Sequence, residues 1–149
     1  MTQENKELLL KDLCARLPYG VKLQKTYEPN VTVELYSINT NDNTIKFYTY
    51  KGESLTMCDI GDIERFGKLR YKPYLFPMSS MTDEQKEEYH HIVNYISPDD
   101  TETWMEGEFI YVDTTQFLRL INFYHRNHLD YRGLINGGLA LDATGLGIY

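Results

Sequence analysis

The chain has 149 residues, of which 42% are hydrophobic and 25% charged, and its formal net charge at pH 7 is −7. A chain of this length and composition buries about 70% of its unfolded surface, so we expect one globular domain over residues 1–149. The acidic net charge disfavours general binding to nucleic acid. The longest apolar runs fall well below the roughly 18–20 residues that a membrane span needs. With a polar N-terminus that lacks a signal-peptide pattern, these features predict a cytoplasmic protein without a membrane partner.

The first half of the chain predicts one helix followed by several strands. Leucines recur at helical spacing over residues 3–16, and Pro18 ends that pattern. Alternating apolar and polar residues then predict strands at 21–27, 31–36, 45–50 and 54–58. Because the connections are short, and one of them is the Asn- and Asp-rich stretch 39–43, we expect an antiparallel meander.

The second half predicts mainly helices. Residues 72–81 are expected to be extended, and a helix begins at Thr82, where Thr82 and Gln85 form a capping box. Its apolar stripe is Tyr89, Ile92, Val93 and Ile96. A strand is expected at 108–112, then a third helix capped by Asp113 and a short fourth helix from Asp130. The third helix is expected to direct four residues to the core: Phe117, Leu120, Ile121 and Tyr124.

These elements together predict an α+β fold. We expect an antiparallel meander sheet or small barrel of about five strands, packed with three to four helices. The tail 143–149 carries no strong structural pattern and is expected to fray.

Charge is segregated along the chain. Residues 65–72 contain Arg65, Lys68, Arg70 and Lys72 and no acidic residue, with Phe66 and Tyr71 interleaved. This mixture is typical of segments that bind phosphates or stack bases. The alternative is a solvated connection whose charges pair with Asp59, Asp62 and Glu64.

Residues 83–108 hold nine acidic residues against Lys86 alone, a net charge of −8. Glu84, Glu87 and Glu88 lie off the apolar stripe of the second helix, so they are candidates for contact with a basic partner protein. The alternative is a solvated helix face.

No motif predicts a catalytic centre or a cofactor. His125 and His128 are three residues apart, which is one metal-compatible spacing, but the HExxH pattern is absent. Ser79 and Ser80 lack the G-x-S-x-G context of a nucleophile, and no P-loop or dinucleotide fingerprint occurs. We therefore expect no cofactor and no metal.

Three stretches carry a family resemblance. They are residues 8–21 (LLLKDLCARLPYGV), residues 72–82 (KPYLFPMSSMT), and DYRGLI at 130–135 with GLAL at 138–141. Together they resemble a family of small proteins from gut bacteria and their mobile elements that has no assigned activity. The resemblance implies kinship and no catalytic residue, cofactor or partner.

The sequence leaves three hypotheses of function open. The leading hypothesis is a non-enzymatic binding or regulatory module that works through protein–protein contacts. The alternatives are a small enzyme whose site is assembled from distant residues, and a module that binds nucleic acid through the 65–72 segment. A pocket that gathers His125, His128, Arg132 and a carboxylate would favour the enzyme.

Overall fold

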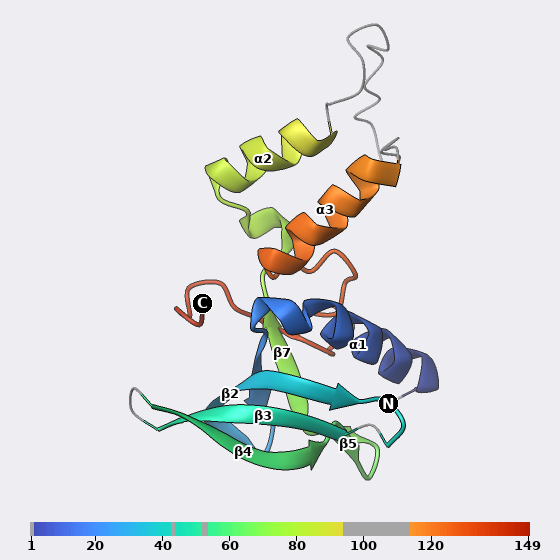
Figure 1. Cartoon of the computed structure of the whole chain (residues 1–149), viewed down its shortest axis with the longest axis vertical. Helices are drawn as coiled ribbons and strands as arrows, with labels where there is room; N and C mark the ends of the chain where they lie inside the picture. The colour runs from blue at the N-terminus through green and yellow to red at the C-terminus, as the bar shows by residue number, and fades with distance from the viewer. Residues whose placement is uncertain (1, 43, 52–53, 94–113) are drawn as a thin grey trace, which may run out of the picture.

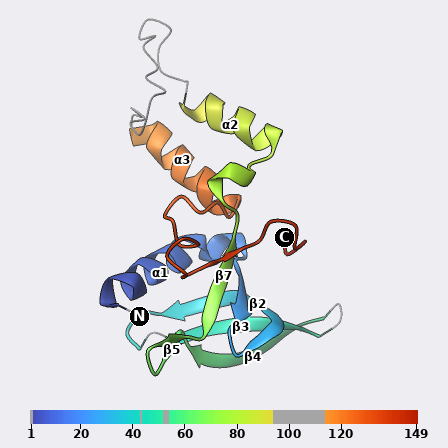
Figure 2. The same cartoon turned by 180° about the vertical axis from the view of Figure 1, so that it is seen from behind.

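A computed structural model of the protein describes residues 2–42, 44–51, 54–93 and 114–149. Figures 1 and 2 show a curved sheet with α1 lying across it, and a pair of helices, α2 and α3, beyond the far end of β7. The fold is α+β, as predicted. Its elements are α1 Gln3–Arg16, η1 Leu17–Tyr19, β1 Lys22–Lys25, β2 Glu28–Asn39, β3 Thr44–Lys51, β4 Ser54–Asp62, β5 Glu64–Arg65, β6 Lys68–Leu69, β7 Tyr71–Leu75, η2 Met78–Ser80, α2 Asp83–Val93, α3 Thr114–Arg126 and β8 Leu141–Asp142.

Helix α1 has the predicted bounds. The Thr2 side chain caps its N-terminus by accepting a hydrogen bond from the amide of Asn5 at 3.2 Å. Leu9 and Leu13 are fully buried against the sheet. The short 3₁₀ helix η1 contains Pro18 and is followed by Gly20, whose φ of 66° is a left-handed conformation that favours glycine.

The main sheet has the strand order β4-β3-β2-β1-β7-β8. Strands β1 to β4 form the predicted antiparallel meander, and β7 adds to β1 in antiparallel orientation. The two-residue strand β8 then pairs with β7 in parallel. The expectation of a purely antiparallel meander or a small barrel is therefore wrong: the sheet is mixed and open, because β7 pairs with β1 and β8 instead of closing against β4.

The buried apolar residues form three clusters. The first joins α1 to the sheet through residues such as Leu13, Leu23 and Phe47. The second surrounds Leu75 and the C-terminal segment. The third joins α2 to α3 around the fully buried Phe123, and the predicted stripe residues Tyr89, Ile92 and Val93 pack against it.

Two predictions for the C-terminal half are wrong. Phe117 is 50% exposed instead of facing the core, although Leu120 and Tyr124 are buried as expected. Residues after Asp130 form turns instead of a fourth helix, so the described residues contain three α-helices. The Asp130 carboxylate stabilises these turns by accepting hydrogen bonds from the amides of Leu134 and Ile135, each at 2.8 Å.

Some expectations fall outside the described residues: the strand at 108–112, the cap at Asp113, the stripe residue Ile96 and most of the acidic segment.

The capping box of α2 is confirmed. Thr82 donates its amide to the Gln85 side chain at 2.9 Å, and the Gln85 amide donates to the Thr82 hydroxyl at 3.2 Å. Among the described helices, none is both long and apolar enough to cross a bilayer.

Candidate functional site

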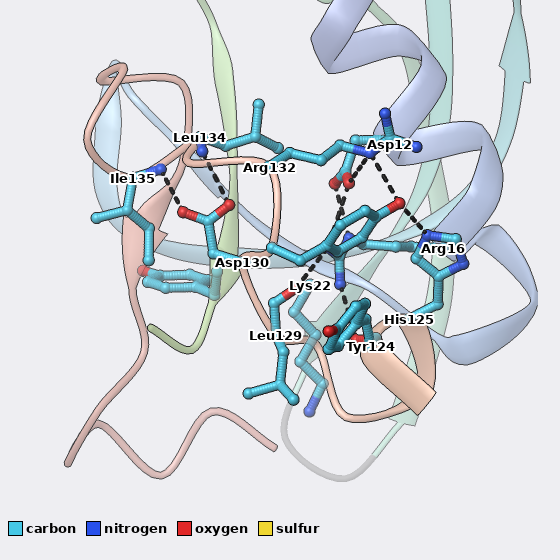
Figure 3. A network of polar contacts seen from close by, with 12 residues as sticks. Asp12, Arg16, Lys22, Tyr124, His125, Leu129, Asp130, Arg132, Leu134 and Ile135 are labelled. Carbon is cyan, nitrogen blue, oxygen red and sulfur yellow. Dashed lines mark hydrogen bonds and ion pairs between the residues drawn. The ribbon is translucent and has the colours of Figure 1, made fainter. Parts of the chain in front are cut away.

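A buried ion pair lies where α1 meets the segment after α3 (Figure 3). Asp12 and Arg16 have no exposed surface, and Arg16 Nε donates to Asp12 Oδ2 at 2.7 Å. The Arg16 guanidinium also donates to the carbonyl oxygens of Leu129 at 2.8 Å and Tyr124 at 3.4 Å. The charges of both side chains are thus compensated by protein groups, as burial requires.

The same region gathers three further polar side chains. His125 Nε2 is hydrogen-bonded to the Tyr131 hydroxyl at 3.0 Å, and Arg132 Nε donates to that hydroxyl at 2.9 Å. Arg132 also forms an ion pair with Asp12 at 3.4 Å. Burial, and next the nearby Arg16 cation, lower the pKa of His125 below its ordinary value. The structure therefore brings His125, Arg132 and a carboxylate together, but as groups that bind one another.

His128 lies apart from this cluster. It follows the end of α3 in a left-handed conformation with φ of 53°, and its ring stacks on the Tyr149 ring with centroids 3.8 Å apart. Burial lowers the His128 pKa to about 4, and the cations Arg16 and Lys22 act in the same direction. His125 and His128 do not combine into a metal site, and no group of three or more potential ligands occurs among the described residues.

The C-terminal residue Tyr149 anchors the tail that was expected to fray. Its hydroxyl donates to the Tyr74 carbonyl at 2.9 Å and accepts from the Lys22 amide at 3.0 Å. The Lys22 ammonium also donates to the Ile148 carbonyl at 2.7 Å. These contacts hold the tail against β1 and β7.

An open groove lies elsewhere, next to the hairpin formed by β5 and β6. Its volume is about 840 Å³, and its walls come from this hairpin, the turn between β1 and β2, the start of β7, the first turn of α1 and residues 137–141. We call it the basic groove, defined by Tyr27, Arg65, Phe66, Lys68, Arg70 and Lys72. Figures 1 and 2 show the hairpin at the edge of the sheet near the N-terminus.

Backbone contacts fix the hairpin in place. The Arg70 amide donates to the Ile63 carbonyl at 2.9 Å, and Ile63 is fully buried. The Thr26 amide donates to the Arg70 carbonyl at 2.9 Å, while the Thr26 hydroxyl donates to the Leu69 carbonyl at 2.7 Å. The hairpin is therefore a rigid support for the basic side chains beside the β1–β2 turn.

The structure brings the predicted basic residues together. Arg65 and Lys68 face each other across the hairpin, and Arg70 and Lys72 line the same groove. The alternative interpretation of the sequence pairs these charges with Asp59, Asp62 and Glu64. Instead, the Glu64 carboxylate forms an ion pair with the Lys6 ammonium, with Oε2 3.9 Å from Nζ. Among the described side chains, Asp62 forms no ion pair, and the four basic residues form none either. The side chain of Asp59 lies outside the described ones.

Two aromatic rings accompany the cations. Phe66 is 91% exposed at the hairpin tip, with the Arg65 guanidinium 5.3 Å from its ring centroid. Tyr27 is 45% exposed, and the Arg70 guanidinium lies 4.1 Å from its ring centroid. Phe66 stands within the basic run of the sequence, whereas Tyr27 lies 43 positions before Arg70 and is brought to it only by the pairing of β1 with β7.

The acidic candidates lie away from the groove, on α2. Glu84, Glu87 and Glu88 are all exposed. Glu88 forms an ion pair with Arg126 of α3. Hydrogen bonds from its own backbone amide and the Thr82 hydroxyl lower the pKa of Glu84. None of the three lines the basic groove.

Comparison with family models, curated proteins and solved structures gives no match for this chain.

Proposed function

We propose that this protein is a non-enzymatic binding module and that its basic groove binds an anionic polymer. The observation that carries the proposal is the concentration of four cationic side chains in one open groove of a protein whose net charge is −7. Cations gathered in a concave surface raise the local potential and attract anionic ligands. Because the described acidic side chains do not pair with them, these cations are available to a ligand.

The chemistry of the groove favours binding over catalysis. Among the described residues that line it there is no carboxylate, histidine, cysteine or serine. Histidine is the commonest general acid or base, and carboxylates, cysteine and serine supply many of the other catalytic groups. Asp12 and His125, which belong to these classes, lie in the buried cluster of Figure 3 and are bound to other protein groups.

The acidic face of α2 is a second candidate surface, for a basic partner protein. It is favoured by the exposure of Glu84, Glu87 and Glu88, of which Glu88 is paired with Arg126 of α3. Exposed charges of this kind mainly accelerate association and lose their effect as salt rises. A partner that binds here should associate several-fold more slowly with the Glu84→Lys, Glu87→Lys, Glu88→Lys variant at low salt only.

The proposal for the groove is tested with long-chain polyphosphate, a polymer that carries charge and no rings. Binding is measured by calorimetry at about 50 mM and 200 mM salt. We expect binding that weakens with salt and is lost in the Arg65→Glu, Lys68→Glu variant. The matched control is Lys11→Glu, Lys46→Glu, which changes the net charge equally at two exposed lysines outside the groove. An equal loss in both variants, or no binding by the native protein, would contradict the proposal.

A further inference from the structure

Phe66 is the least expected residue of the basic groove. Phe66 and Gly67 form a two-residue hairpin loop in which both φ angles are positive, 54° and 75°. Such loops favour Asn or Asp before Gly, since other side chains are strained there. Phe66 adopts this strained conformation, and 91% of its surface is exposed to water. Neither the backbone conformation nor burial therefore explains why a phenylalanine occupies this position. A strained and exposed residue of this kind points to a function.

Tyr27 provides a second ring in the same groove. Its hydroxyl is hydrogen-bonded to that of Tyr71 at 3.1 Å, and the two rings meet edge to face. The guanidinium of Arg70 lies 4.1 Å from the Tyr27 ring centroid. Tyr27 is therefore fixed in orientation with Arg70 on one face of its ring, while 45% of its surface remains exposed to a ligand.

The arrangement of rings and cations selects the ligand. Arg65 and Lys68 flank Phe66, and Arg70 and Lys72 lie on the Tyr27 side of the groove. A polymer that alternates flat rings with phosphates can use both kinds of group at once. Proteins that bind single strands combine a positive groove with aromatic platforms in this way. A duplex hides the faces of its bases, so it would leave Phe66 and Tyr27 without partners.

We propose that the basic groove binds single-stranded nucleic acid, with bases stacked on Phe66 and Tyr27 and phosphates held by Arg65, Lys68, Arg70 and Lys72. This inference rests on the proposed function and names the ligand of the same site. The groove is open, so a strand can pass through it with both ends outside. The four cations fit a strand that contacts the protein over a few nucleotides.

The test is fluorescence anisotropy of the full-length protein with labelled single strands of about 12 nucleotides, within the usual site size of such proteins. Oligothymidylate and oligouridylate are compared, so that DNA and RNA are distinguished. A mixed-sequence duplex, long-chain polyphosphate and oligoglutamate are the competitors. We expect either single strand to bind at least about 10-fold more tightly than all three, because stacking adds to the charge interaction. The logarithm of the binding constant should fall by about 0.7 for each tenfold rise in salt concentration and each phosphate contacted.

Variants of Phe66 separate stacking from charge. Phe66→Ala should weaken single-strand binding by about 10-fold and leave polyphosphate binding unchanged. Phe66→Trp should keep the affinity, whereas Phe66→Leu should lose it, because leucine is apolar but has no ring to stack. Since Phe66 is exposed, none of these changes removes packing, and circular dichroism confirms that each variant is folded.

Three outcomes overturn the inference while the proposed function stands. In the first, polyphosphate and single strands bind equally tightly and Phe66→Ala binds single strands as the native protein does. In the second, the duplex binds more tightly than single strands. In the third, oligoglutamate binds more tightly than single strands, which would indicate an acidic protein partner. Absence of binding to every polyanion would overturn the proposed function as well. A fourth outcome overturns the inference in the same way: retained affinity in Phe66→Leu, which would mean that Phe66 enters an apolar pocket and does not stack.

Discussion

Arg16 Nη2 donates a hydrogen bond to the carbonyl oxygen of Leu129, a residue 113 positions further along the chain, at 2.8 Å. This contact joins α1 to the turn that follows α3. The next residue, Asp130, completes that turn through its bonds to Leu134 and Ile135. The buried cluster of Figure 3 therefore connects the part of the protein that contains the sheet to the α2–α3 pair.

Removing the carboxylate of Asp12 tests this connection. Asp12→Ala should destabilise the protein by about 3–5 kcal/mol, because it leaves the fully buried Arg16 cation without its counter-charge. The free energy of unfolding is measured in urea. The double variant Asp12→Ala, Arg16→Met should lose less than the sum of the single variants, since it leaves no buried cation unpaired. A loss below about 1 kcal/mol for Asp12→Ala would contradict this role.

Stability should decrease in mild acid through His128. Burial lowers the pKa of His128 from its ordinary 6.5 to about 4, so between these values the unfolded chain binds a proton that the native protein excludes. This contribution is therefore complete above pH 6.5 and is lost as the pH falls towards 4. The slope approaches about 1.4 kcal/mol per pH unit for one proton. His125, whose pKa is also lowered, acts in the same direction.

The measurement is urea denaturation between pH 7 and pH 5, where most carboxylates remain ionised. His128→Asn is the matched variant, because asparagine tolerates the left-handed conformation at φ of 53° and does not titrate. Its stability should change less with pH than that of the native protein. Parallel profiles for the two proteins would show that His128 makes no such contribution.

Helix α3 gives a comparison between a buried and an exposed apolar residue. Leu120 is 6% exposed and packs in the cluster with Phe123, whereas Phe117 is 50% exposed one turn earlier. Leu120→Ala should destabilise by about 2–5 kcal/mol, the range for a truncated core leucine. Phe117→Ala should change stability by no more than about 0.5 kcal/mol. Similar losses in urea denaturation would mean that both side chains are buried in solution.

Sequence patterns predicted the elements whose causes are local. Helix α1 followed from leucine spacing and Pro18, and the start of α2 from the pairing of Thr82 with Gln85. The α1 pattern gave no sign of the buried ion pair. Asp12 and Arg16 resemble an ordinary exposed i, i+4 pair, and only contact with residues more than 100 positions away buries them.

Long-range contacts explain the error in the sheet and the missing aromatic ring, whereas a local bonding pattern explains the error after Asp130. The parallel pairing of β8 with β7 joins Tyr74 to Leu141, and no local pattern in a two-residue strand indicates it. The prediction of a fourth helix was wrong because the Asp130 carboxylate accepts hydrogen bonds from the amides four and five residues ahead, which stabilises turns, whereas a helix-capping Asp accepts from the amides two or three residues ahead. The basic run was visible in the sequence, but its second ring, Tyr27, was not.

The hairpin tip gives a prediction in which stability and binding change in opposite directions. Phe66→Asn places the residue that favours a left-handed conformation before Gly67, and Phe66 has almost no packing to lose. We expect the free energy of unfolding to increase by about 0.5–1 kcal/mol. Affinity for oligothymidylate should fall by about 10-fold, as in Phe66→Ala, because the stacking ring is gone.

Gly67→Ala is the control for the backbone argument. A Cβ at Gly67 would meet no atom within 4 Å, so the change adds strain at φ of 75° without a clash. It should destabilise by about 1 kcal/mol while keeping the Phe66 ring in the groove. If Phe66→Asn instead lowers stability, Phe66 packs against the protein in solution. The strain at the tip would then have a structural explanation, and the case for a stacking role would lose its main observation.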